Sequence, residues 1–449
     1  MMRLRLLTLA AQFLHAQIAI VDVTVIDPRA RSVVPGQTVL VDEGRIMGAG
    51  PASEVKFAAR YRTVDGRRRF LIPGLWDNHV HLTKAGETSL ALFLANGVTS
   101  VRDMGSDPDE VLRWRAEIEA GKRAGPRIRT SGRILESKAN VVRMKSEGGV
   151  EPVDRIRIGA GTPEEARKAV EFLAGLHVDH IKIRTVASPE VFDAIADAAR
   201  RASLPLAGHA FGRPEDYIGR MKSVEHSPAF PPLDNLTRDQ RAALFGRMRD
   251  QGTWMSTTVV NLDGSVLIPY DQASRMMQTK ESRDARSDPR RRYIGGYLLT
   301  DWREQVEEKK DAESGALRKI VPGLWRDLVE VREAGVKFLP GTDVAVAFIY
   351  PGFSLHDELQ IYVARLGFTP MEALRAATHN PAEFYGIEAK QGGIAPGQAA
   401  DLLLLDASPL DDIANTKKIR AVAAGGRLWT RRQLDDLLAA TARDVARLK

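Results

Sequence analysis

Two histidines separated by one residue are the first sign of chemistry in this sequence. His79 and His81 stand in LIPGLWDNHVHL, which we interpret as the end of a strand that starts after Pro73 and Gly74. Side chains alternate along a strand, so both imidazoles are expected on the same side, where they could share a metal ion. Asp77, two residues before His79, could orient this pair without binding the metal itself.

A lysine inside an apolar strand is the second unusual feature. Lys182 lies in HIKIR, where apolar neighbours make a charged amine unfavourable. Burial would lower its pKa, and the neutral amine could react with carbon dioxide to give a carbamate, which acts as a carboxylate ligand. The alternative for such a lysine, taken alone, is a side chain that faces solvent at a sheet edge.

Three further candidate ligands each follow a different predicted strand. The strand in LPLAGHA ends at His209, the strand in SVEHS ends at His226, and Asp343 is the last residue of LPGTD. Each of them alone could be satisfied by backbone hydrogen bonds. Together with the HxH pair and Lys182, they form a set of donors that suits two divalent cations. Cysteine is absent, so thiolate ligands and disulfides are excluded.

The elements that must position these residues alternate between strand and helix. Helical patterns fill the gaps between short apolar runs, for instance at 163–176 after Thr162 and at 189–202 after Ser188. Eight strand-helix repeats favour an α/β fold closed into a (β/α)8 TIM barrel, whose active site assembles where the strands end. The predicted strands are 75–80, 99–102, 127–130, 180–183, 205–209, 223–226, 254–259 and 337–339.

Both ends of the chain show a different, antiparallel-strand pattern. Residues 18–26 and 37–46, and again 401–406 and 419–429, are apolar or β-branched runs interrupted by turn residues. The sequence therefore predicts a small β-sandwich assembled from both chain ends. Its expected segments are 17–68 and 391–435, and the barrel is expected to span 69–390.

Two connections are too long for a simple barrel. Residues 131–161 are polar and glycine-rich, and residues 261–332 carry charge-dense helical patterns. Both follow strands, so both are expected on the catalytic face, where they could form a lid or a collar around the substrate. Simple decoration of the barrel, or a contact within a homo-oligomer, is the alternative.

The candidate ligands and the segments ALRAATHNPAEFYG and GGIAPGQAADLLLLDASPL resemble the amidohydrolase superfamily, in its binuclear branch. The likeness extends over residues 18–438 and is closest to the imidazolonepropionase-like and prolidase-like dipeptidase group. The resemblance implies two divalent cations, with Zn²⁺ expected. It implies that His79, His81 and Asp343 bind one cation, that His209 and His226 bind the other, and that Lys182 bridges them as a carbamate.

The reaction implied by the resemblance is hydrolysis of a C–N amide or peptide bond in a small substrate, a dipeptide or an N-acyl amino acid. A hydroxide shared by the cations would attack, and Asp343 would pass its proton to the leaving amine. The alternatives are a cyclic amide or lactone hydrolase with the same cations and, from another class, a non-catalytic scaffold with this fold.

Two residues are candidates for substrate binding. Tyr217 corresponds to a tyrosine that contacts the substrate carbonyl in related dipeptidases, with loop packing as its alternative role. Arg184 lies two residues beyond Lys182 and could hold a substrate carboxylate through its planar fork, with a structural ion pair as the alternative.

Composition limits the partners. The net charge is +7, but Lys and Arg are scattered among nearly as many acidic residues, so nucleic-acid binding is not expected. No apolar run reaches the ~20 residues of a membrane-spanning helix. Residues 1–16 resemble a weak secretory signal, which would imply a periplasmic or secreted protein. The alternative is an N-terminal helix that is frayed or packed on a cytoplasmic protein.

Overall fold

The computed structural model describes residues 17–278, 288–310 and 314–448. The predicted signal segment, residues 1–16, lies outside the described residues.

All eight predicted barrel strands are present, and they pair in parallel. Two further strands, β9 (Ile134–Ser137) and β10 (Arg157–Ala160), extend the sheet outward from the third barrel position. The eight barrel strands are β6 (Leu75–Val80), β7 (Val98–Asp103), β8 (Arg127–Thr130), β11 (Ile181–Ile183), β12 (Leu206–His209), β13 (Ser223–Glu225), β14 (Trp254–Thr257) and β15 (Phe338–Pro340).

Backbone contacts close these strands into a (β/α)8 TIM barrel. At the seam between β15 and β6, the Asp343 N–H donates to the His79 carbonyl oxygen at 2.7 Å, and Val80 forms a parallel bridge with Val344. On the opposite side, the Asp179 N–H donates to the Thr130 carbonyl oxygen of β8 at 2.8 Å, and β9 pairs with β11. The segment that carries Asp343 is therefore held directly against the segment that carries His79.

Helices cover the barrel, and their capping residues follow the sequence pattern. The predicted helix starts are confirmed for α6 (Pro163–Gly175) and α7 (Pro189–Arg201), because the side chains of Thr162 and Ser188 accept hydrogen bonds from backbone N–H groups in the first turns. The other helices of the barrel layer are α1 (Leu82–Ala85), α2 (Ser89–Ala95), α3 (Pro108–Glu119), α8 (Pro214–Tyr217), α9 (Arg238–Asp250), α13 (Ser354–Ala364) and α14 (Pro370–Phe384).

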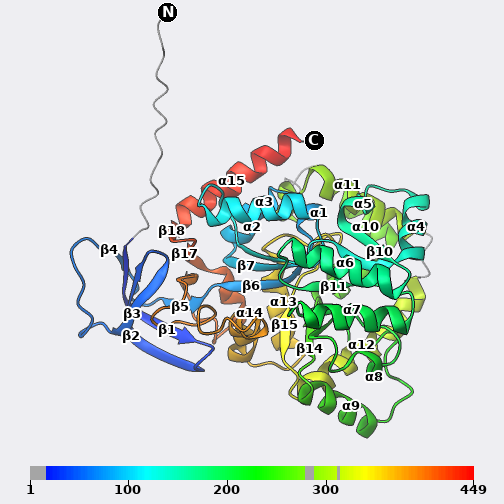
Figure 1. Cartoon of the computed structure of the whole chain (residues 1–449). Helices are drawn as coiled ribbons and strands as arrows, with labels where there is room; N and C mark the ends of the chain where they lie inside the picture. The colour runs from blue at the N-terminus through cyan, green and yellow to red at the C-terminus, as the bar shows by residue number, and fades with distance from the viewer. Residues whose placement is uncertain (1–16, 279–287, 311–313, 449) are drawn as a thin grey trace, which may run out of the picture.

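Strands from both ends of the chain form one eight-stranded sheet beside the barrel (Figure 1). Its central pairing joins the two ends, because β5 lies between β1 and β16. After β18 the chain continues through α15 (Arg431–Arg447), and the 3-10 helix η3 (Ile413–Lys417) precedes β17. The strands are β1 (Ile18–Asp27), β2 (Ser32–Asp42), β3 (Arg45–Pro51), β4 (Arg62–Asp65), β5 (Phe70–Pro73), β16 (Leu402–Leu405), β17 (Ile419–Ala424) and β18 (Arg427–Thr430).

The run at residues 37–46, expected to contain antiparallel strands, holds the end of β2 and the start of β3. Residues 37–46 are not a single strand, because the chain reverses at Glu43 and Gly44, which have φ angles of 48° and 72°. The apolar alternation on the two sides of this turn belongs to β2 and β3, which pair in antiparallel fashion. A two-residue turn of this kind joins neighbouring antiparallel strands.

The two long connections lie together over one end of the barrel. Residues 131–161 contain β9, α4 (Lys138–Glu147), α5 (Val153–Ile156) and β10. Residues 261–332 contain η1 (Leu262–Val266), α10 (Tyr270–Gln278), η2 (Pro289–Tyr293), α11 (Gly296–Glu308) and most of α12 (Ser314–Glu333). The Val150 N–H donates to the Glu304 carboxylate at 3.1 Å, so the two connections contact each other directly.

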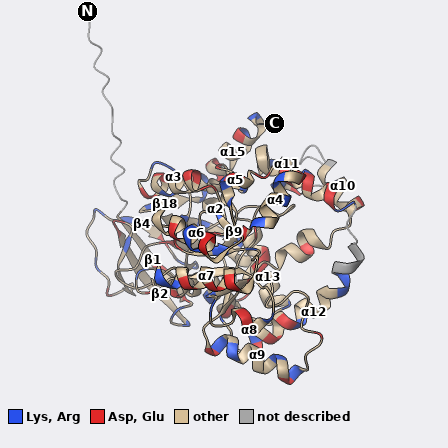
Figure 2. Cartoon of the chain, turned by 45° about the vertical axis from the view of Figure 1, so that its right-hand side comes forward, with Lys and Arg blue, Asp and Glu red and all other residues tan. Residues whose placement is uncertain are grey.

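Charges of both signs are interspersed on the surface helices, as α7 and α9 show in Figure 2. Among the described residues, no helix is both long and apolar enough to span a bilayer.

Candidate metal centre

The histidine pair lies at the end of β6, with both rings turned toward Asp343. His79 is fully buried, and its Nε2 is 3.6 Å from Asp343 Oδ1. The Nε2 of His81 is 3.3 Å from the same oxygen. The expected placement of both rings on one side of the strand is therefore confirmed.

Hydrogen bonds at Nδ1 leave the Nε2 atoms of both rings available. His79 Nδ1 is 2.9 Å from Glu225 Oε2, and His81 Nδ1 is 3.0 Å from the Gly105 carbonyl oxygen. Both partners are acceptors, so in each neutral ring Nδ1 carries the hydrogen and Nε2 carries the lone pair. This is the arrangement found for metal-binding imidazoles.

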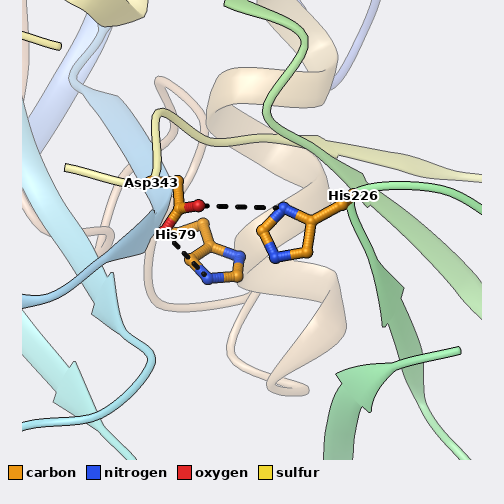
Figure 3. A group of neighbouring side chains, drawn as sticks. All are labelled: His79, His226 and Asp343. Carbon is orange, nitrogen blue, oxygen red and sulfur yellow. Dashed lines mark ion pairs between the residues drawn. The ribbon is translucent and has the colours of Figure 1, made fainter. Parts of the chain in front are cut away.

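His209 and His226 form a second group next to this pair. Their Nε2 atoms are 3.2 Å apart, and His226 Nδ1 lies 2.8 Å from Thr258 Oγ1 and 3.9 Å from Asp343 Oδ2. Figure 3 shows the His79 and His226 rings next to each other, with a dashed line from the Asp343 carboxylate to each of them. One ligand atom from each of these three residues lies within 4.8 Å of the others, which is compatible with a shared cation.

Lys182 lies buried in β11, with its amine at the same cavity. Its Nζ is a buried atom without a hydrogen-bond partner among the described residues. Burial lowers the pKa of Lys182 to about 8, and Arg102 and Arg184 act in the same direction, while Glu225 and Asp343 oppose the shift. The amine is therefore much closer to its neutral, reactive form at pH 7 than an exposed lysine is.

The protonation of the cluster also suits cations. Burial lowers the pKa values of His79, His209 and His226, so these imidazoles are neutral at pH 7. Burial alone would raise the pKa of Asp343, but the surrounding histidines hold it well below its usual range. Neutral imidazoles and an ionised carboxylate are the states in which these side chains bind metal ions.

Two buried nitrogen atoms of the cluster are free to act as metal ligands. Besides Lys182 Nζ, the buried Nε2 of His79 has no hydrogen-bond partner among the described residues. Buried polar atoms are normally satisfied, and a metal ion is one of the groups that can satisfy them. Two donors from different strands are thus left without a protein partner within one cluster.

Backbone conformation at the cluster is unusual at two positions. His226 and Asp343 have φ angles of 70° and 56°, in the left-handed region that side chains with a Cβ seldom adopt. Strain of this kind persists where the surroundings enforce it, and it concentrates at functional sites. The chain before Asp343 is also packed closely against His79, because a Cβ on Gly341 would lie 2.6 Å from the His79 Cβ.

Asp77 acts on the backbone rather than on the imidazole rings. Its carboxylate accepts hydrogen bonds from the Thr342 backbone N–H at 2.9 Å and from the Thr342 hydroxyl at 2.6 Å. Burial raises the pKa of Asp77 to about 7, and these hydrogen bonds oppose that shift. Asp77 also accepts the His79 backbone N–H at 3.4 Å. It therefore links the backbone of the histidine pair to the segment that precedes Asp343.

A buried ion pair contacts the cluster through His79, and it was not identified from the sequence. Arg102 Nη2 lies 2.7 Å from Glu225 Oε2, and neither side chain is exposed. Arg102 also donates to the Asn78 carbonyl oxygen at 2.6 Å and to the hydroxyls of Ser223 and Ser256. The available signal was a charged residue inside each of two short strands, VTSVRD and SVE.

The cluster lies at the base of a cavity of about 620 Å³. His81, Lys182, His209, His226 and Asp343 line it, and residues of both long connections form its walls. Lys84 joins these walls, because its Nζ lies 2.6 Å from Glu151 Oε2 and 3.5 Å from Asp301 Oδ1. The volume suits a small molecule.

The two predicted substrate residues are placed differently. Arg184 lines the cavity with a side chain that is 40% exposed, and its Nη1 is 3.5 Å from Glu136 Oε2. Tyr217 is not among the residues that line the cavity; it is buried, and its hydroxyl donates to the Pro228 carbonyl oxygen. The position of Tyr217 corresponds to loop packing, the alternative role considered for it.

Of the remaining described histidines, His356 is the clearest structural one. Its two ring nitrogens lie 2.9 Å from Thr416 Oγ1 and 2.9 Å from the Asn96 carbonyl oxygen.

Comparisons with known proteins identify the family of the chain. The model of the amidohydrolase family matches residues 70–428. The imidazolonepropionase of Symbiobacterium thermophilum is 23% identical over 397 residues, which cover 83% of this chain and 84% of that protein. The ochratoxinase of Aspergillus niger is 39% identical over 101 residues, 22% of this chain and 20% of that protein.

Among solved structures, a protein from Bifidobacterium longum that was provisionally described as a prolidase aligns with a TM-score of 0.71 and 26% identity. The alignment covers 95% of this chain and 99% of that one.

Proposed function

Because this chain belongs to the amidohydrolase family and is a hydrolase acting on carbon–nitrogen bonds, we propose that it cleaves the amide bond of a dipeptide or an N-acyl amino acid with the aid of two divalent cations. The observation that carries the proposal is the convergence of four histidines, Asp343 and the partnerless Lys182 amine at the base of one cavity. Such a donor set has few uses other than binding metal ions.

In this proposal the residues divide into two ligand groups. His79, His81 and Asp343 would hold one cation, and His209 and His226 would hold the other. Lys182, as a carbamate formed with carbon dioxide, would supply a ligand to both. When bound, the cations, with Zn²⁺ expected, would supply an activated water and polarise the scissile carbonyl.

Asp343 serves the proton transfer. Its carboxylate is ionised and lies at the base of the cavity, so it can take the proton of the attacking water. The same oxygen can return this proton to the amine as the C–N bond breaks. Arg184, on the cavity wall, binds the substrate carboxylate and places the amide above the cluster.

A substrate panel tests the proposed reaction. The purified chain, supplied with Zn²⁺, is assayed for amine release from dipeptides and N-acyl amino acids, with cyclic amides and lactones alongside. We expect turnover of the first two classes, and we expect Asp343→Ala to lose at least about 1000-fold of it. Turnover confined to cyclic amides or lactones would contradict the substrate class, and a wild-type protein that retains no stoichiometric metal would contradict the cation site.

The role of Arg184 has its own test. A charge-assisted hydrogen bond contributes about 1.5–3 kcal/mol, so Arg184→Met should raise KM about 10- to 100-fold for substrates with a free carboxylate. Their C-terminally amidated counterparts should change little. Arg200→Met, at a side chain that is 76% exposed on α7, is the matched control. An equal effect of Arg184→Met on both substrate types would rule out carboxylate binding.

A further inference from the structure

A buried carboxylate on α13, behind the cluster, has no part in the chemistry described so far. Glu358 has no solvent exposure. Its Oε2 accepts the Val260 N–H at 2.7 Å, and its Oε1 accepts the Thr257 hydroxyl at 2.7 Å and the Val259 N–H at 3.2 Å. One side chain thus holds three donors from a single short segment.

That segment, residues 257–261, starts at the last residue of β14 and makes two contacts with the candidate ligands. Thr258, between two residues that Glu358 holds, places its Oγ1 2.8 Å from His226 Nδ1. Asn261 donates from Nδ2 to Asp343 Oδ2 at 3.3 Å. The segment therefore contacts one residue of each proposed ligand group.

Backbone pairing holds only part of this segment: the Thr258 and Val259 carbonyl oxygens accept the N–H groups of Asn261 and Leu262, but the N–H groups of Val259 and Val260 have no backbone acceptor among the described residues. β14 ends at Thr257, so the N–H groups of Val259 and Val260 are beyond the last strand pairing. Without Glu358 these two buried donors would lack their acceptor, and buried N–H groups without acceptors are strongly disfavoured. The Glu358 carboxylate is the acceptor that both N–H groups share, so it helps to fix the chain where the strand passes into the next turn.

We propose that Glu358 is a positioning residue that, through segment 257–261, holds His226 and Asp343 in the orientation needed to bind cations. This inference rests on the proposed function, because it assumes that these two residues are ligands. Groups that orient ligands in this way typically account for about 10- to 100-fold in metal affinity. Glu358 touches neither the cavity nor a ligand and acts only through the chain it holds.

The test is zinc affinity, measured on the apoprotein by competition with a chelating dye. Glu358→Gln keeps the size of the side chain but replaces one carboxylate oxygen by an NH2 group. That NH2 group would face a hydrogen-bond donor of segment 257–261 that the oxygen accepts in the wild type. We expect the wild type to bind two zinc ions and Glu358→Gln to bind at least one of them about 10- to 100-fold more weakly. Glu171→Gln, the same change at an exposed side chain on α6, is the matched control; its zinc affinity should stay within about twofold of wild type.

A double-mutant cycle shows whether Glu358 acts through Thr258. Thr258→Val removes the contact to His226, so adding it to Glu358→Gln should cost less than the product of the two single effects. If Glu358→Gln does not fold, Thr257→Val, which removes one of the donors that fix the carboxylate, should give a smaller loss of zinc affinity in the same direction. Unchanged zinc affinity, or fully independent effects, would overturn the inference. A wild type that binds no zinc would instead overturn the proposed function.

Discussion

At the scale of single residues, Lys182 is the residue on which the proposal of two cations, rather than one, depends. Its Nζ is buried beside four imidazoles and has no hydrogen-bond partner among the described residues. A carbamate would convert this isolated donor into a ligand with two oxygens. The unmodified amine is a buried polar atom without a hydrogen-bond partner in the described part of the chain, and the carbamate proposed above would give it ligand oxygens to share with the cations.

Removal of the Lys182 side chain should abolish stoichiometric binding of two cations. We expect Lys182→Ala to lower kcat by at least about 1000-fold and to reduce the bound metal below two ions per chain, because the bridging ligand is lost. Elemental analysis and steady-state kinetics measure both effects. Lys168→Ala, at a side chain that is 71% exposed, is the control and should match wild type. Near-normal turnover of Lys182→Ala would rule out the bridging role.

The pKa of Lys182 predicts how its modification depends on pH. Only the neutral amine reacts with carbon dioxide, and burial lowers this pKa from 10.5 to about 8. Below pH 8 the amine is mostly protonated, so the rate of bicarbonate-dependent reactivation of the stripped apoprotein should rise about tenfold per pH unit and level off above pH 8. Stopped assays between about pH 6 and pH 10, at a fixed concentration of dissolved carbon dioxide, follow this rate. A rate that keeps rising to pH 10 would indicate an unperturbed lysine.

Residue types and spacing were sufficient to identify the candidate ligands but not what supports them. The structure brings together all of the predicted ligands: His79, His81, Lys182, His209, His226 and Asp343. Each follows or occupies a barrel strand, so the parallel topology alone places them on one face. Glu225 and Arg102 could not be paired from the sequence, because their contact joins strands 123 residues apart and leaves no local pattern.

At the scale of secondary-structure elements, the Arg102–Glu225 pair connects β7 and β13 across the barrel interior. Breaking a fully buried pair leaves one charge without compensation, which costs about 3–5 kcal/mol. We therefore expect Glu225→Gln to lower the free energy of unfolding by about 3 kcal/mol or more, measured by urea denaturation. Arg102→Met together with Glu225→Gln should cost less than the two single changes added together. Additive effects would mean that the two side chains stabilise the barrel independently.

Prediction of the elements succeeded where a pattern was local. The barrel strands and the caps of α6 and α7 follow from short apolar runs and from Thr162 and Ser188. β9 and β10 were missed, because they lie in a polar connection and pair only with each other and with the barrel edge. Their pairing depends on tertiary contact rather than on strand propensity.

At the scale of the whole molecule, cations would connect parts of the chain that are far apart. The proposed ligands come from five barrel strands or the segments directly after them, between residues 79 and 343. In the unfolded chain these groups are far apart, so cations bind the folded state much more tightly. Binding and folding are therefore linked.

This linkage predicts the effect of metal removal on stability. A free cation at about 100 times its Kd adds about 2.7 kcal/mol per site to the folded state, so dialysis against a chelator should lower Tm and added Zn²⁺ should restore it. Differential scanning calorimetry at matched pH and ionic strength measures the shift. A variant with His79 and His81 both changed to Asn should show a Tm that no longer responds to Zn²⁺ as the wild type does, because one ligand group is lost. If the wild-type Tm were the same with chelator and with Zn²⁺, the cluster would not be a cation site, since a ligand that binds only the folded state must stabilise it.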